Sequence, residues 1–248
     1  MFKNIKDKRV LITGASGGIG SCMVLLFADH HAKVGIHHHN GKKEAENLVR
    51  QVEKKHGCAA SFQADLLKDV SDSLIESFIE RFGGIDILIN NAGGIFGSMD
   101  ILELDSMSWV NTFRLNTQAP FFLAQGAFRF MKNNGGGKII NISSISAKYG
   151  GSDRTLHYGA SKAALEAINL GLAKAGAPQN ILVNTIRAGF IDTPMHKKLG
   201  RTNLERRIDA IPLKKPGKAE DIARMALFLA SECGDFITGE IFTVAGGD

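Results

Sequence analysis

A tyrosine and a lysine four residues apart are the part of this sequence best suited to acid–base chemistry. Tyr158 and Lys162 are followed by apolar residues at helical spacing, which predicts a helix through both. Residues four apart share a helix face, so we expect the ammonium beside the phenol. A neighbouring cation favours phenolate and lowers the pKa of a phenol from its usual value near ~10. Such a pair can protonate a carbonyl oxygen or deprotonate an alcohol, although an ordinary amphipathic helix can also carry a Tyr and a Lys at this spacing.

A glycine-rich turn near the N-terminus indicates a nucleotide site. An apolar run at residues 9–13 predicts a strand, and Gly14, Gly18 and Gly20 follow it before a helical pattern begins. Glycines let the backbone approach a pyrophosphate, and the N-terminus of the next helix offers it free N–H groups. The spacing is not the usual G-x-G-x-x-G, and such turns can also be purely structural.

The end of the second expected strand bears on the choice of cofactor. In a dinucleotide-binding fold this end meets the adenosine ribose, where an acid would bind the 2′-hydroxyl and repel a 2′-phosphate. The chain has no acid between Lys33 and Lys43, and His38, His39 and Lys42 would attract a phosphate. This favours NADP(H), with NAD(H) as the alternative. Three consecutive histidines also suggest a metal site, but no further ligand is signalled nearby, so we expect a polar strand end and no metal.

These motifs lie at the ends of strands that alternate with helices along the whole chain. The alternation predicts an α/β fold with one Rossmann-type, doubly wound parallel sheet and helices on both faces. Seven strands are expected, at residues 9–13, 33–37, 59–64, 85–89, 138–142, 181–186 and 240–244. We expect a single dinucleotide-binding and catalytic domain over residues 1–248, with a polar, proline-bounded flap over the site at about 194–215.

Other polar residues follow the expected strands or interrupt an apolar helix. Asp65 could accept a hydrogen bond from an adenine amino group, or cap the helix expected near residues 70–82. Residues 90–93, Asn-Asn-Ala-Gly, could line a cofactor or form an ordinary turn. A long helix is expected over residues 105–132, with Asn116 in its middle. Pro120 would break the helical ladder there and free a carbonyl that could hold a water.

Composition limits the classes of function. The 248 residues are enough for one large α/β domain, and the net charge of +5 is spread without a basic stripe, so we expect no nucleic-acid partner. Three cysteines lie far apart, which predicts a reducing compartment. The sequence has no apolar stretch suited to a signal peptide or membrane span, and we expect a cytoplasmic protein. The long helix has more large apolar residues than one core-facing stripe needs, so some are expected to face a partner subunit.

Together these motifs resemble the classical short-chain dehydrogenase/reductase family over essentially the whole chain. The features that carry the resemblance, in order, are Thr13-Gly14-x-x-x-Gly18-x-Gly20, Asn90-Asn91-Ala92-Gly93, Asn116, Ser143-Ser144, Tyr158-x-x-x-Lys162 and the turn from Gly189 to Thr193. Within the family the chain is most similar to bacterial 3-oxoacyl-[acyl-carrier-protein] reductases, through Ile211-Pro212-Leu213, the run from Gly217 to Ala223 and Ile237-Thr238-Gly239.

The resemblance implies a role for each catalytic residue. Tyr158 would be the acid/base, and Lys162 would lower its pKa and bind the nicotinamide ribose. Ser144 would hydrogen-bond the substrate oxygen. We prefer Ser144 to Ser143 because the second serine of the pair is the usual one, although the loop to Tyr158 is one residue longer than is common. Asn116 would hold the water of a proton relay.

The resemblance also implies a cofactor site and an assembly, and it shows departures. The cofactor residues would be Gly14, Ser16, Gly18, Ile19, Gly20, His38, His39, Asp65, Leu66, Asn91, Ala92, Gly93, Tyr158, Lys162, Gly189, Ile191 and Thr193. Gly17 stands where many NADPH-preferring members carry a basic residue, Ala188 replaces a usual proline, and Ala245 replaces a common aspartate. A homotetramer, or a homodimer, is expected.

The function expected from all of this is reversible hydride transfer between NAD(P)H and a carbonyl/alcohol pair, as in a 3-oxoacyl-[acyl-carrier-protein] reductase. One alternative is an NAD-dependent alcohol, sugar or steroid dehydrogenase on the same scaffold. A remote alternative is a non-catalytic cofactor-binding protein. The substrate would be a small or carrier-bound carbonyl compound, with Arg154, His157 and Arg201 as solvated charges or contacts to an anionic group.

Overall fold

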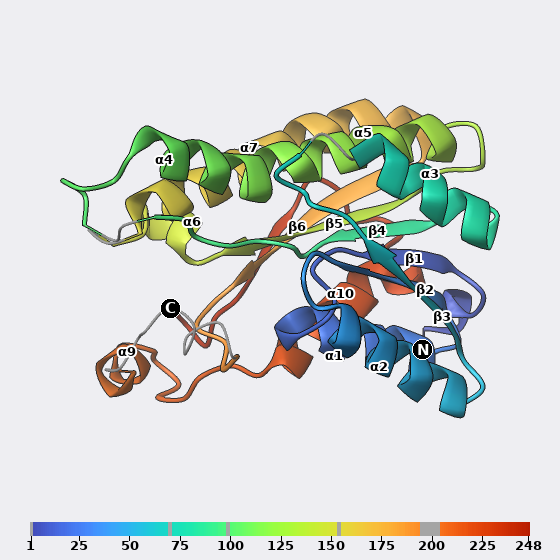
Figure 1. Ribbon diagram of the computed structural model, residues 1–248, viewed down its shortest axis with the longest axis horizontal. Coiled ribbons are helices and arrows are strands. Elements are labelled where there is room, and N and C mark those ends of the chain that lie inside the picture. Colours follow the sequence, from blue (N-terminus) through green and yellow to red (C-terminus); the bar gives the residue numbers. More distant parts are fainter. Residues whose placement is uncertain (1, 69–70, 98–99, 153–154, 194–203) are drawn as a thin grey trace.

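Seven parallel strands form one sheet in the computed structural model, which describes residues 2–68, 71–97, 100–152, 155–193 and 204–248 (Figure 1). The spatial order is β3-β2-β1-β4-β5-β6-β7, and every neighbouring pair is parallel. The strands are β1 (Arg9–Ile12), β2 (Lys33–His38), β3 (Cys58–Gln63), β4 (Ile87–Asn90), β5 (Gly137–Ser144), β6 (Ile181–Ala188) and β7 (Ile241–Val244). The predicted doubly wound α/β sheet is confirmed.

Helices cover both faces of the sheet because successive strand residues point to opposite sides. Val10 and Ile12 enter a core beneath α1, α2 and α10, whereas Leu11 enters a second core beneath α3, α5 and α7 (Figure 1). The helices are α1 (Gly18–Asp29), α2 (Lys42–Lys54), α3 (Ser71–Phe82), α4 (Ser106–Phe113), α5 (Ala119–Met131), α6 (Ser146–Tyr149), α7 (Leu156–Gly176), α9 (Glu205–Asp209) and α10 (Ala219–Ala230).

The parallel arrangement brings the carboxyl ends of all the strands to one edge. Chain order reverses between β1 and β4, which are neighbours in the sheet. Ligands of open α/β sheets bind in the crevice at such a switch point. The glycine turn after β1 and the Asn-Asn-Ala-Gly loop after β4 therefore meet where a dinucleotide is expected.

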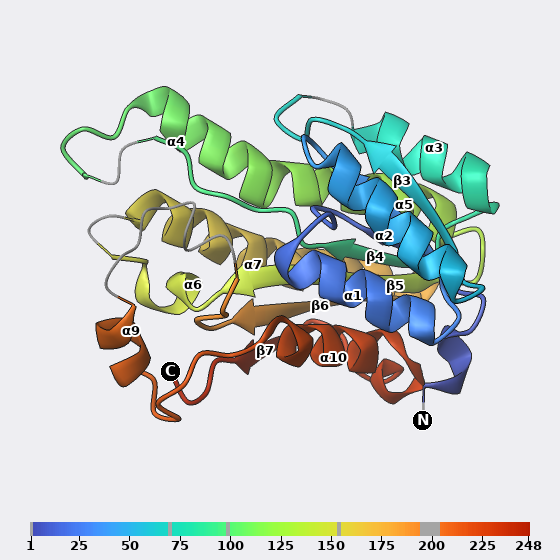
Figure 2. The same cartoon turned by 60° about the horizontal axis from the view of Figure 1, so that its bottom comes forward.

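The long helix predicted over residues 105–132 is present and runs continuously from α4 (Figure 2), and its winding changes near its centre. Asp105 caps α4 by accepting a hydrogen bond from the N–H of Ser108 at 2.8 Å. Between α4 and α5 the chain forms a turn of π-helix, η2 (Arg114–Gln118), around Asn116. Pro120 lacks the N–H that would continue an α-helical ladder, which fits a wider turn just before it.

Three other sequence expectations concern the flap, the cysteines and membrane-spanning segments. Of the flap at about 194–215, residues 194–203 lie outside the described residues, as do Arg154 and Arg201, and the remainder carries α9. Cys22, Cys58 and Cys233 are all free thiols. Among the helices that the structure describes, none is both long and apolar enough to cross a membrane.

Candidate active site

Helix α7 presents Tyr158 and Lys162 together at the carboxyl edge of the sheet. The Lys162 Nζ lies 6.0 Å from the centre of the Tyr158 ring, so the two share a helix face as expected. Lys162 is only 3% exposed, and its ammonium donates to the carbonyl of Ile142 on β5 at 2.8 Å. Burial lowers the pKa of Lys162 to about 8, against the opposing effect of the Glu166 carboxylate. At neutral pH this buried lysine is therefore mainly a cation beside the phenol.

Asn116 holds the loop after β4 in place. Its Oδ1 accepts from the N–H of Gly94 at 3.0 Å, and its Nδ2 donates to the carbonyls of Gly94 at 2.7 Å and Thr112 at 2.9 Å. A Cβ on Gly93 would lie 2.9 Å from Asn116 Oδ1 and 3.1 Å from Lys162 Nζ, so only glycine fits without displacement. The loop, the π-turn and the buried lysine thus meet at Gly93.

The two serines at the end of β5 have different surroundings. Ser143 is 3% exposed and its hydroxyl donates to Glu166 Oε1 at 2.7 Å. Ser144 is half-buried, and its Oγ accepts from the N–H of Ser146 at 3.2 Å. An accepted bond leaves the hydroxyl proton able to bind another oxygen. These contacts support Ser144 as the serine that meets a substrate.

His37 fastens the glycine turn, a role that its sequence did not reveal. Its Nδ1 accepts from the N–H of Gly14 at 3.1 Å, and its Nε2 lies 3.1 Å from the carbonyl of Ala64. An imidazole that accepts at Nδ1 and donates at Nε2 is neutral. Burial lowers the pKa of His37 to about 4, so the neutral form persists at physiological pH. The polar strand end expected here is a buried brace between β1, β2 and β3.

A second set of hydrogen bonds joins the turns after β1 and β4. Asn91 donates from Nδ2 to the carbonyls of Thr13 at 2.9 Å and Gly14 at 3.1 Å. The Thr13 hydroxyl accepts from the backbone N–H of Asn91 and of Ala92, both at 3.0 Å. A Cβ on Gly20 would lie 2.6 Å from the Gly14 carbonyl oxygen, so α1 begins against this turn only because residue 20 is glycine.

The glycine turn fits a pyrophosphate. Gly14 and Gly18 have φ of +59° and +57°, a region that residues with a Cβ rarely adopt. The N-cap residue of α1 is Gly17, which has no side chain to bond the N–H groups of the first helical turn. These N–H groups are the expected donors to a phosphate. A Cβ on Gly18 would be 3.8 Å from Thr193, which places the turn after β6 over the glycine turn.

The remaining predicted cofactor residues lie in α1 or in the segments that follow β1, β3 and β6. Gly189 packs so closely that a Cβ there would lie 2.6 Å from the Cα of Ala245. Ile191 is buried and forms a bridge with Gly217, and Leu66 is buried after β3. Ile19 is half-buried on the first turn of α1. A Cβ on Gly41 would approach the Ser16 hydroxyl to 2.5 Å, so Ser16 lies beside the end of β2.

The histidines and Asp65 lie at the ends of β2 and β3, where the adenosine of a dinucleotide is expected. His38 is 3% exposed, whereas the His39 side chain is half exposed and its Nε2 lies 3.8 Å from Asp65 Oδ2. Asp65 Oδ1 accepts from the N–H of Leu67 at 3.1 Å, so Asp65 caps a local turn after β3. The exposed basic side chains around Asp65 and the end of β2 include His39, Lys42 and Lys68. No group of three or more His, Cys, Asp or Glu within the described ranges could hold a metal ion.

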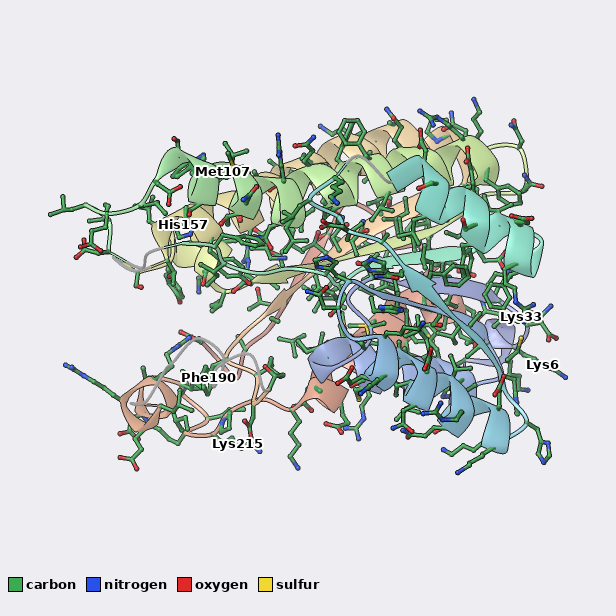
Figure 3. The ribbon with its side chains drawn as sticks, in the orientation of Figure 1. Lys6, Lys33, Met107, His157, Phe190 and Lys215 are labelled. Atoms are coloured by element: carbon green, nitrogen blue, oxygen red, sulfur yellow. The ribbon has the colours of Figure 1, made fainter. Side chains whose placement is uncertain are left out.

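His157 is buried, so the expectation that it is a solvated charge is wrong. It is 2% exposed, and its Nε2 lies 3.0 Å from the carbonyl of Phe96. Figure 3 shows His157 at the same end of the molecule as Met107 of α4. The residue before Tyr158 therefore ties the loop after β4 to α7.

Comparisons with known proteins agree with this geometry. A sequence family described as enoyl-(acyl carrier protein) reductase matches residues 14–248. The 3-oxoacyl-[acyl-carrier-protein] reductase FabG of Thermotoga maritima is 34% identical over 244 residues, covering 98% of each chain. A blue fluorescent protein from a metagenomic library, crystallised with NADPH, superposes with a TM-score of 0.92 at 33% identity, covering 98% of both chains. A 7α-hydroxysteroid dehydrogenase, complexed with NADH and 7-oxo glycochenodeoxycholic acid, gives a TM-score of 0.92 at 31% identity, covering 99% of this chain and 96% of its own. This chain belongs to the short-chain dehydrogenase/reductase family.

Proposed function

We propose that this protein is an NADPH-dependent ketoreductase that reduces a 3-oxoacyl group carried as a thioester. The observation that carries the proposal is the buried Lys162 ammonium 6.0 Å from the Tyr158 ring, at the edge where the glycine turn lies. The full-length relatives named as 3-oxoacyl-[acyl-carrier-protein] reductases support the substrate class.

NADPH, when bound, supplies the hydride that goes to the carbonyl carbon. Tyr158 gives its phenolic proton to the oxygen that becomes the alcohol, and Ser144 holds that oxygen by a hydrogen bond. Lys162 stabilises the phenolate that Tyr158 leaves behind. Hydrogen-bond donors already aimed at a developing alkoxide typically lower the activation barrier by about 3 kcal/mol each. The side chain of Asn116 is bonded to Gly94 and Thr112, so the expected relay water would bind its backbone carbonyl.

The preference for NADPH rests on charge at the end of β2. No acid lies between Lys33 and Lys43 to bind a ribose 2′-hydroxyl, the Lys42 ammonium is exposed, and the His39 ring offers N–H groups to a phosphate. A Cβ on Gly17 would meet nothing within 4 Å, so the position where relatives carry a basic residue is open space. The NADPH complex of the metagenomic protein supports the same preference.

A homotetramer is the proposed assembly. On α4 the side chains of Met107, Trp109 and Val110 are 63%, 38% and 39% exposed. An exposed apolar patch of this kind marks a surface that contacts another protein, here a second subunit. Light scattering after size-exclusion chromatography measures the mass, and about four times 26.7 kDa is expected.

The test of function is the oxidation of NADPH by a 3-oxoacyl thioester such as acetoacetyl-coenzyme A. We expect turnover with NADPH and a much lower kcat/KM with NADH. Tyr158→Phe should lower kcat by about 10³-fold, because it removes the proton donor. The Kd for NADPH, measured by fluorescence, should stay within about two-fold because phenylalanine keeps the ring. Turnover of Tyr158→Phe at the wild-type rate would contradict the mechanism.

A second candidate is an NAD-dependent alcohol, sugar or steroid dehydrogenase, and the superposition on the hydroxysteroid dehydrogenase with its NADH supports the steroid class. The same assay separates the two. Oxidation of secondary alcohols with NAD⁺, without reduction of the thioester, would select this candidate.

A further inference from the structure

We propose that Glu166, held by Arg187 and Ser143, is a positioning residue that aligns α7 with the ends of β5 and β6. The proposal rests on the function proposed above, because the side chains that it aligns are those of the reductase mechanism. Glu166 has no part in that mechanism, and it lies one helical turn beyond Lys162.

Three hydrogen bonds hold the Glu166 carboxylate. Arg187 binds it with two hydrogen bonds, from Nε to Oε1 at 2.9 Å and from Nη2 to Oε2 at 2.6 Å. Ser143 donates a third, to Oε1 at 2.7 Å. The Glu166 side chain is 9% exposed and that of Arg187 is 19% exposed. Such a two-pronged guanidinium contact fixes orientation as well as distance.

Each partner of the carboxylate is next to a residue of the candidate site. Ser143 directly precedes Ser144, and Arg187 lies opposite Ser143 in the register of β5 and β6. Arg187 precedes the turn that contains Gly189, and it also donates from Nη1 to the Thr243 hydroxyl of β7 at 3.3 Å. One carboxylate therefore connects the helix that carries the acid/base to three strand ends.

A stability role alone explains this arrangement poorly. A buried ion pair often contributes no more than apolar side chains of the same volume, because both charges lose hydration. The fixed geometry of the pair is useful where strand ends must keep a set distance from a helix. Glu166 also opposes the effect of burial on the pKa of Lys162. The other groups facing that ammonium are Tyr158 on the same helix, the Ile142 carbonyl of β5 and Gly93 after β4.

The chain offers a matched control at the opposite edge of the sheet. Arg9 binds Asp86 through Nε to Oδ2 at 2.7 Å and Nη2 to Oδ1 at 2.8 Å, with side chains 24% and 20% exposed. This pair joins the amino ends of β1 and β4, far along the strands from the candidate site. Asp86→Asn and Glu166→Gln therefore remove the same charge from similar pairs, with only the second next to the active site.

The experiment compares both variants with wild type in unfolding, in kcat against pH and in NADPH binding at pH 6 and pH 9. We expect both variants to lose stability, but only Glu166→Gln to lower kcat, by about 10-fold or more. In the plot of kcat against pH, the loss of activity on the alkaline side should begin at lower pH in Glu166→Gln, because Lys162 loses the carboxylate that favours its charged form. Its NADPH Kd should rise from pH 6 to pH 9 by a larger factor than that of wild type, a readout that needs no turnover.

Ser143→Ala tests the same idea without a charge change, and it decides the matter if Glu166→Gln does not fold. We expect kcat of Ser143→Ala to fall several-fold, while the pH at which kcat declines on the alkaline side stays that of wild type. The proposal is overturned if Glu166→Gln matches Asp86→Asn in kcat, in pH profile and in NADPH binding, or if Ser143→Ala keeps the wild-type kcat. If the wild-type enzyme turned over none of the carbonyl compounds tried, the proposed function would be refuted. The NADPH dissociation constants at pH 6 and pH 9 would still test the positioning role of Glu166.

Discussion

Acid should loosen this protein at the glycine turn, through protonation of His37. The imidazole accepts the N–H of Gly14 at Nδ1, and a second proton would turn that acceptor into a donor. The pKa of His37 is about 4 in the folded protein, against 6.5 for an ordinary histidine. As pH falls below 6.5 the unfolded chain takes up this proton first. Stability is therefore complete above pH 6.5 and is lost between pH 6.5 and 4.

The size of the effect follows from these two pKa values of His37, about 4 when folded and 6.5 when unfolded. Their difference corresponds to about 3 kcal/mol of unfolding free energy in all, of which about 2.5 kcal/mol is lost by pH 4.5. Little discount for solvent is needed because His37 is 2% exposed.

The assay is urea unfolding at pH 7.0 and pH 4.5 for wild type, His37→Gln and His56→Asn. Glutamine offers one acceptor and one donor but does not titrate, so His37→Gln should lose about 2.5 kcal/mol less than wild type on acidification. His56 is exposed, and asparagine tolerates its φ of +59°, so His56→Asn should follow wild type. Equal losses in wild type and His37→Gln would refute the account of His37 as a buried neutral brace.

Three further predictions concern the catalytic edge. Ser144→Ala should lower kcat by about 10²-fold with NADPH affinity unchanged, which steady-state kinetics and fluorescence titration will measure. Gly93→Ala should lower kcat, and it should lower the free energy of unfolding by about 1–3 kcal/mol, because its Cβ would lie 3.1 Å from Lys162 Nζ. Thermal unfolding measures the loss of stability, and a variant as stable and as active as wild type would contradict the packing at Gly93. In a Tyr149→Phe background Tyr158 is the single tyrosine, and Lys162→Met should move its absorbance titration to higher pH, since the cation 6.0 Å from the ring is gone; an unmoved midpoint would exclude Lys162 as its electrostatic partner.

Local sequence signals were enough for the elements and for much of the site. Alternation of apolar runs with helical patterns predicted all seven strands to within a few residues. The spacing of Tyr158 and Lys162 predicted their shared face because a helix repeats within four residues. Pro120 marked the place where the long helix changes its winding.

Contacts between distant elements were the part that sequence reasoning missed. Glu166 and Arg187 are each unremarkable charges until the register of β5, β6 and α7 brings them together. His37 was grouped with its two histidine neighbours, although strand alternation turns it inward to Gly14. His157 was expected in solvent or at a ligand, because nothing local shows that the loop at Phe96 covers it. The polar run at 37–39 and the acid one turn after Lys162 were the available signals.

The π-turn η2 sets the rotational phase between two halves of one helix. A π-turn holds one residue more than an α-turn, which advances the following side chains by about 100° around the axis. Asn116 within the turn thus meets Gly94, while α5 beyond it is rotated so that Leu123 enters the core. A substitution on α4 or on α5 therefore leaves the rotation of the other helix about its axis unchanged. Deletion of a single residue from the turn would instead rotate one contact surface away from its partner, so the chain's length here is as constrained as its composition.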